Sequence, residues 1–237
     1  MFKEYIISHR DEMIKDLEKM IKIPSKLEGY DDKEYPFGKN IDDALNEFLK
    51  IAENLGFRTK NIDKYCGYVE FGEGEEYYKN YAVEEEFGEG EELVGIIGHL
   101  DVVPEGEGWT YPPFELTIRD DILYGRGTID DKGPVIASLY AMKAVMEKTA
   151  IHKRVRLIVG LNEENDWKCI NYYKEHEEMP IIGFSPDADF PCIYSEKALL
   201  TVYTEQQYIE NEKIRIKEID CQNNRINVVP KYCSVKL

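Results

Sequence analysis

Two residues near position 100 have the types and the spacing of a metal-binding pair. His99 and Asp101 follow the apolar run 93–97, which is typical of a buried strand. Residues two positions apart on an extended backbone point to the same side, so we expect the imidazole and the carboxylate to lie together. An imidazole supported by a carboxylate suits a metal ligand, whereas a lone histidine at a strand end is more often only a polar cap.

Acidic residues occur in three further motifs, each at a predicted strand end. They are Asp130 and Asp131, Glu163 and Glu164, and Asp187 and Asp189. In open α/β sheets the carboxyl ends of the strands line one crevice, so these side chains can converge. One histidine with several carboxylates suits Zn²⁺, Mn²⁺ or Co²⁺. Taken singly, each acid could instead cap a helix, lie in a solvated loop or form a turn, but their shared placement favours a site.

The elements that would position these groups alternate along the chain. Hydrophobic periodicity predicts helices at about 2–22, from a cap at Asn40 to Gly56, at about 134–148 with Pro134 in the first turn, and from a cap at Asp166 to about 177. Strands are expected at 68–71, 93–97, 114–118, 122–124, 154–159 and 181–184. This alternation predicts an α/β domain with a largely parallel sheet.

The pattern changes after about residue 196. Segments 199–204, 213–219 and 233–237 have the composition of strands, and no long helix is predicted between them. We therefore expect residues 1–196 to belong to one domain and residues 197–237 to begin a second.

Composition narrows the class of protein. The 237 residues include 30 Lys and Arg against 47 Asp and Glu, a net charge of −17, which disfavours nucleic acid and anionic membranes as partners. Five scattered cysteines disfavour a disulfide framework. No secretory leader and no apolar run of membrane-spanning length is recognised, so a cytoplasmic location is expected.

One short repeat is present. The segment 71–76, Phe-Gly-Glu-Gly-Glu-Glu, recurs at 87–92. Two copies do not make a repeat architecture, so a surface hairpin or a local duplication in the gene explains them. We favour the duplication.

Four segments taken together resemble a known family. They are His99–Pro104, Gly125–Pro134, Asn162–Glu164 and Phe184–Ala188. They are similar to the co-catalytic zinc exopeptidases, which include aminoacylases and glutamate carboxypeptidases. Segments Asp187–Pro191 and Glu107–Trp109 point to the bacterial dipeptidase branch of the PepV or Sapep type. The resemblance extends to Asn227–Pro230 and implies an incomplete zinc-exopeptidase-like sheet flanked by helices, followed by the start of an α+β lid domain.

The resemblance implies a site with two divalent metals, with zinc favoured and manganese or cobalt as alternatives. Asp130 would bridge the two metals. His99 and Asp187 would complete the ligands of one metal, and Glu164 would bind the other. In the family the peptide bond after the bridging aspartate is cis, so a cis Asp130–Asp131 bond is expected.

The resemblance also implies the catalytic groups. Asp101 would hydrogen-bond His99 and fix its tautomer. Glu163 would be the general base that takes a proton from the metal-bridging water and returns it to the leaving amine. The implied reaction is hydrolysis of a dipeptide from its free amino terminus.

The chain departs from the family pattern in its histidines. The second metal-ligand histidine and the lid histidine of the family lie downstream, and His9, His152 and His176 have no matching context. The chain therefore resembles the N-terminal half of a dipeptidase, with apolar surface left uncovered, and a complementing C-terminal half or a homodimer is the expected partner. The alternatives are an N-acyl amino acid deacylase or desuccinylase, and an inactive fragment that binds metal or a partner.

Overall fold

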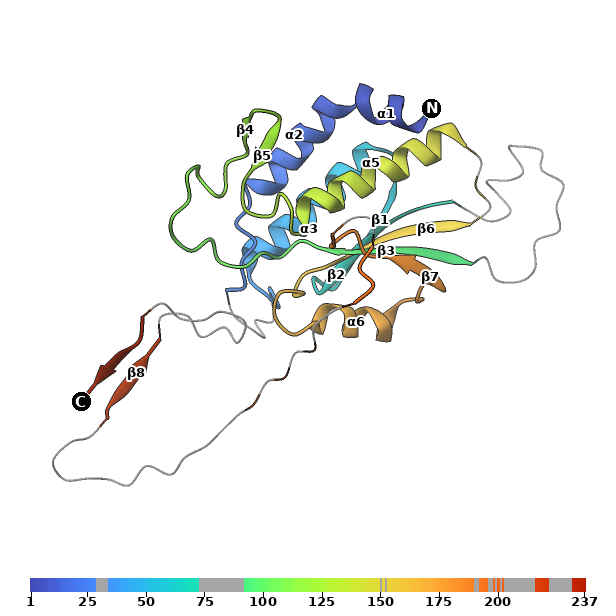
Figure 1. Ribbon diagram of the computed structural model, residues 1–237. Coiled ribbons are helices and arrows are strands. Elements are labelled where there is room, and N and C mark those ends of the chain that lie inside the picture. Colours follow the sequence, from blue (N-terminus) through green and yellow to red (C-terminus); the bar gives the residue numbers. More distant parts are fainter. Residues whose placement is uncertain are drawn as a thin grey trace. The chain divides into compact units, whose positions relative to one another are not determined.

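The computed structural model (Figure 1) describes residues 1–28, 34–72, 92–149, 151, 153–189, 192–195, 198, 200, 202, 216–221 and 232–237. The chain divides into two compact units, Met1–Asp189 and Phe190–Leu237. The sequence repeat lies almost entirely outside the described residues, as do His152 and the segment Asn227–Pro230.

The first unit is built on a five-stranded sheet with the strand order β1-β2-β6-β3-β7. The strands are β1 (Arg58–Ile62), β2 (Cys66–Phe71), β3 (Leu93–His99), β6 (Arg154–Gly160) and β7 (Ile182–Phe184). Strand β3 pairs in parallel with both β6 and β7, whereas β2 is antiparallel to both β1 and β6. Four of the five strands therefore run in one direction, which confirms the predicted α/β class with a mostly parallel sheet. Strand β1 was not predicted.

Helices cover both faces of this sheet (Figure 1). On one face, α3 (Lys39–Asn54) packs on β1 and β2, and α5 (Lys132–Lys148) packs on β3 and β6. Helices α1 (Phe2–Ser8) and α2 (Arg10–Ile21) lie against α5. Helix α6 (Lys168–His176) packs on β2 from the opposite face. The central strands are buried between these layers, so β3 and β6 carry nearly continuous apolar runs.

The predicted helix 2–22 is two helices, because the chain breaks at His9. The Ser8 hydroxyl donates to the Tyr5 carbonyl oxygen at 2.8 Å, and His9 Nδ1 lies 2.8 Å from the same oxygen. Side chains that compete for a helical carbonyl in this way favour a break.

Helix α6 also begins differently from the prediction. It starts at Lys168, and the residue before it is Trp167, whose backbone is left-handed with φ 60° and ψ 20°. Trp167, and not the predicted Asp166, is therefore the N-cap residue of this helix, although Asp166 Oδ1 accepts the Lys168 N–H at 3.4 Å. Helix α5 begins at Lys132, which places Pro134 in the first turn as predicted.

Two hairpins complete the described structure. In the first unit β4 (Thr117–Arg119) pairs with β5 (Ile122–Tyr124), so the strand predicted at 114–118 lies slightly further along the chain. In the second unit β8 (Glu218–Asp220) pairs with β9 (Ser234–Lys236), in the regions of two predicted strands. Most of the third predicted strand, 199–204, lies outside the described residues. Among the described helices, none has the length and apolar character needed to cross a membrane.

Candidate active site

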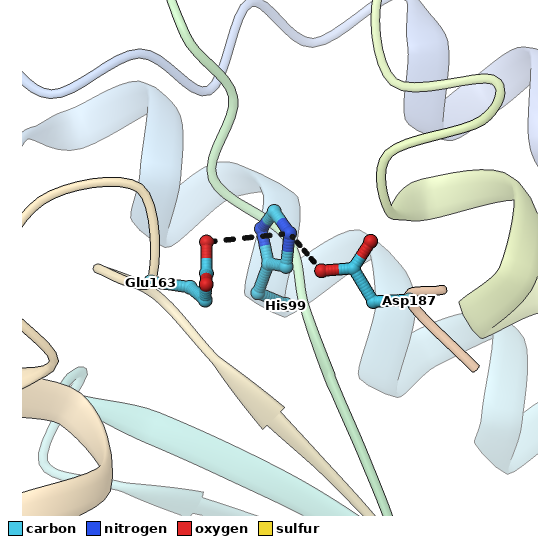
Figure 2. Close-up of side chains that lie close together, drawn as sticks. All are labelled: His99, Glu163 and Asp187. Atoms are coloured by element: carbon cyan, nitrogen blue, oxygen red, sulfur yellow. Dashed lines mark ion pairs between the residues drawn. The ribbon is translucent and has the colours of Figure 1, made fainter. Parts of the chain in front are cut away.

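The predicted site residues meet at one edge of the sheet. His99 is the last residue of β3, Glu163 follows β6 and Asp187 follows β7. Because these three strands are parallel neighbours, their carboxyl ends lie side by side. One ligand atom from each of the three residues lies within 4.8 Å of the others. Figure 2 shows the carboxylates of Glu163 and Asp187 on opposite sides of the His99 ring.

The alternation of side chains along β3 directs His99 to the α6 face of the sheet. A Cβ atom at Gly98 would lie 2.6 Å from Val135 Cγ2 on α5, so Gly98 faces α5 and the next residue faces away from it. His99 is paired with Gly160, where a Cβ atom would lie 2.9 Å from Cys169 Sγ on α6. The imidazole is therefore buried at the strand end, on the side where α6 begins.

The hydrogen bond at Nδ1 fixes which nitrogen of His99 faces the acids. Nδ1 lies 2.9 Å from the Asp101 carbonyl oxygen, and because a carbonyl only accepts, Nδ1 carries the hydrogen. The Asp101 carboxylate is further away, with Oδ1 3.4 Å from Nδ1. Nε2 then points at three carboxylates, at 3.0 Å from Asp130, 3.4 Å from Asp187 and 3.7 Å from Glu163.

Asp101 joins two parts of the site. Its carboxylate is 1% exposed and accepts two backbone N–H groups, from Glu163 at 3.0 Å and from Glu164 at 3.1 Å. The same residue's carbonyl oxygen holds His99. Asp101 thus fixes both the His99 ring and the backbone of Glu163 and Glu164. The predicted contact between Asp101 and His99 is present, but the carbonyl oxygen of Asp101 is closer to the ring than its carboxylate is.

The segment after β5 supplies two further acids. The Asp130–Asp131 peptide bond is cis, as the family resemblance implied. The Asp130 side chain is half exposed and reaches His99 Nε2. Asp131 turns the other way and is fully buried, and its Oδ2 atom accepts the His99 backbone N–H at 2.9 Å. The space for Asp131 exists because residue 98 is a glycine.

Burial and neighbouring charges shift the pKa values of the site residues. Burial would lower the pKa of His99, but its interactions with Asp101 and Asp130 outweigh burial and hold that pKa far above its usual value. The His99 interaction lowers the pKa of Asp130. Burial raises the pKa of Glu163, and burial followed by the Asp130 charge raises the pKa of Glu164 to about 7.

These donors fit a divalent cation. Nε2 faces three carboxylates, so a positive charge, either a proton or a metal ion, is needed between them. Imidazole nitrogen and carboxylate oxygen are the ligand types that Zn²⁺ and Mn²⁺ take in proteins. Because Nδ1 carries the hydrogen, the free electron pair of a neutral His99 is on Nε2, the nitrogen that faces the acids.

The structure brings together most of the predicted site residues, and it places at the site two residues to which the sequence assigned no role. His99, Asp130, Glu163 and Asp187 lie around one point, and Glu164 is held beside them through its backbone. The additions are Asp131, which holds the His99 backbone, and Trp167, which lines a cavity beside His99. The pairing of two acids at 130–131 was a signal for the first. No signal in the sequence pointed to the second.

Comparison with known proteins assigns this chain to a family of peptidases. The model of peptidase family M20/M25/M40 matches residues 95–222, and the chain belongs to that family. The family predicted from the four sequence segments is thereby confirmed.

Among curated proteins, the chain is 40% identical over 197 residues to the "Putative dipeptidase YtjP" of Bacillus subtilis, covering 82% of this chain and 39% of that protein. It is 35% identical over 247 residues to a "Putative dipeptidase" of Staphylococcus aureus, covering 100% of this chain and 48% of that protein. The chain thus spans less than half the length of these relatives.

A solved structure supports the fold. Human carnosine dipeptidase 1 matches 73% of this chain and 37% of its own, with a TM-score of 0.55 and 22% sequence identity. At this identity the likeness concerns the fold alone.

Proposed function

We propose that this chain carries one metal-binding part of a dipeptidase site, which hydrolyses short peptides with the help of divalent cations. The observation that supports the proposal most strongly is the convergence of three carboxylates on Nε2 of a buried histidine. Membership of the peptidase family and the names of the relatives point to the same reaction.

His99, Asp130 and Asp187 would hold one cation, and Glu164 together with Asp130 would hold a second. Zinc is the proposed metal, with manganese or cobalt as alternatives. Cations held there would supply electrostatic activation, by lowering the pKa of water and polarising the scissile carbonyl group.

Glu163 is the proposed general base. Its carboxylate lies beside the proposed cation ligands, and burial raises its pKa above the usual value, which favours proton uptake. It would take a proton from the attacking water and deliver it to the leaving amine. Asp101 keeps the Glu163 backbone in place for both transfers.

We also propose that residues 1–196 are the N-terminal part of a catalytic domain and that residues 197–237 begin a lid domain. Strand β7 forms one edge of the sheet, and its Ile182 and Phe184 side chains are 65% and 58% exposed. An apolar edge strand of this kind favours pairing with another segment. We propose that a C-terminal half, or a second copy, covers it. We place the protein in the cytoplasm, from its cysteine pattern.

The test is hydrolysis of dipeptides by this chain, alone and mixed with the C-terminal remainder of the Bacillus subtilis relative, with Zn²⁺, with Mn²⁺ and with a chelator. The proposal predicts metal-dependent release of amino acids that Glu163→Gln reduces by about 100-fold or more. N-acetyl and N-succinyl amino acids are assayed in parallel. Preferential cleavage of these would favour the deacylase alternative, and no turnover by the mixture with any metal would contradict the proposal.

A further inference from the structure

A small cavity opens beside His99 on the α6 face of the sheet. It has a volume of about 40 Å³, and its walls have two chemical characters. His99, Glu163 and Asp187 supply the polar side, whereas Ile97, Trp167 and Ile170 supply an apolar side. The cavity therefore places apolar surface directly against the groups that the proposed reaction uses.

Trp167 is the largest residue in the apolar wall and remains 49% exposed. Its backbone has φ 60°, a conformation that bulky residues rarely adopt and that glycine or asparagine would adopt more easily. The helix start thus has no need of a tryptophan, and the exposed indole gains little from packing. A strained aromatic residue beside reactive groups is a reason to look for a functional contact.

The backbone of Trp167 is hydrogen-bonded to the segment that carries the proposed base. The Trp167 N–H donates to the Asn162 carbonyl oxygen at 3.1 Å, and the Trp167 carbonyl oxygen accepts from Ile170 and Asn171, both at 3.1 Å. Asn162 directly precedes Glu163, whose own N–H is held by Asp101. These main-chain bonds fix the position from which the indole reaches the cavity relative to the proposed base.

We propose that Trp167 contacts the substrate and determines its specificity: the indole and Ile170 receive an apolar side chain of the dipeptide next to the scissile bond. This inference rests on the proposed function and names its substrate class, dipeptides with a small aliphatic side chain at that position. The contact is dispersion and exclusion of water, so it discriminates by side-chain size and polarity.

Tryptophan fluorescence tests this contact, because the chain contains only Trp109 and Trp167. Trp109→Phe leaves Trp167 as the sole reporter, and Trp167→Phe leaves Trp109 as the matched control. Both are made with Glu163→Gln, which stops turnover, and are saturated with Zn²⁺, which does not quench. The probes are Val-Gly, Gly-Val and Gly-Gly, and calorimetry measures their binding independently.

We expect one of the two valine dipeptides to bind about 10-fold or more tightly than Gly-Gly and to shift the emission of Trp167 but not of Trp109. Trp167→Ala should reduce that preference to about 2-fold, whereas Trp109→Phe should keep it. Equal binding of all three dipeptides, or a preference that survives Trp167→Ala, would overturn the inference and leave the proposed function intact. Failure to bind zinc would overturn both.

Discussion

The carboxylate of Asp101 holds the backbone of Glu163, whose N–H donates to Asp101 Oδ1 at 3.0 Å. Its other oxygen accepts the Glu164 N–H at 3.1 Å, so both oxygens of a buried carboxylate are used on main-chain donors. The carbonyl group of the same residue sets the tautomer of His99. The geometry of the proposed base and of the histidine therefore depends on one buried residue.

Asp101→Asn should weaken the site without removing a proposed ligand. The new amide group can accept only one of the two N–H groups, so one buried donor loses its partner, at a cost of about 1–3 kcal/mol in the free energy of unfolding. Zinc affinity should fall about 10–100-fold. Chemical denaturation and calorimetry measure the two effects. Asp121→Asn, at a side chain that is 92% exposed, is the control, and equal behaviour of the two variants would contradict this account.

Gly98→Ala should disturb the site by displacing the Asp131 side chain that packs against Gly98. The added methyl group would collide with Asp131 Oδ2 and with Val135 on α5, which should destabilise the fold by about 1–3 kcal/mol. Asp131 must then move away from the His99 N–H, so zinc affinity should also fall. Gly106→Ala is the comparison, because a Cβ atom there meets nothing within 4 Å and only the backbone strain of φ +69° remains. Unchanged zinc binding in Gly98→Ala would refute the proposed link.

The metal-free chain should lose stability as the pH rises from about 4.5 to about 7. Burial raises the pKa of Glu164 to about 7, so over this range the folded chain keeps a proton that the unfolded chain releases. The folded state binds more protons, and the free energy of unfolding therefore falls with rising pH. Glu164→Gln cannot titrate and should show a shallower fall in thermal unfolding measured with a chelator. Glu115→Gln, at an exposed position, serves as the control; matching pH profiles for all three proteins would rule out this contribution.

The proximity of His99, Glu163 and Asp187 could be predicted from the sequence, because it follows from their positions at the ends of predicted parallel strands. Each follows an apolar run, and neighbouring parallel strands present their carboxyl ends at one edge. The apolar face of α3 was predictable for a similar reason, since the residues at helical spacing are the buried ones. In both cases a local sequence pattern is enough to predict where the side chains lie.

Other features depend on contacts between distant segments. Asp131 can reach the His99 backbone only because Gly98 lacks a side chain, and no spacing within either segment shows this. Strand β1 alternates weakly, with most of its side chains exposed, so its pairing with β2 defines it more than its composition does. The break at His9 is local, but it depends on how two neighbouring side chains compete for one carbonyl oxygen, which helical periodicity does not reveal.

The central claim is that His99 and the surrounding carboxylates bind a divalent cation. Equilibrium dialysis against zinc, with metal analysis of the chain, tests it in the wild type, in His99→Ala and in His176→Ala, whose imidazole is exposed on α6. We predict at least one tightly bound zinc per chain in the wild type and in His176→Ala, and an affinity lower by about 100-fold or more in His99→Ala. Equal zinc binding by His99→Ala and the wild type, or none by either, would contradict the claim.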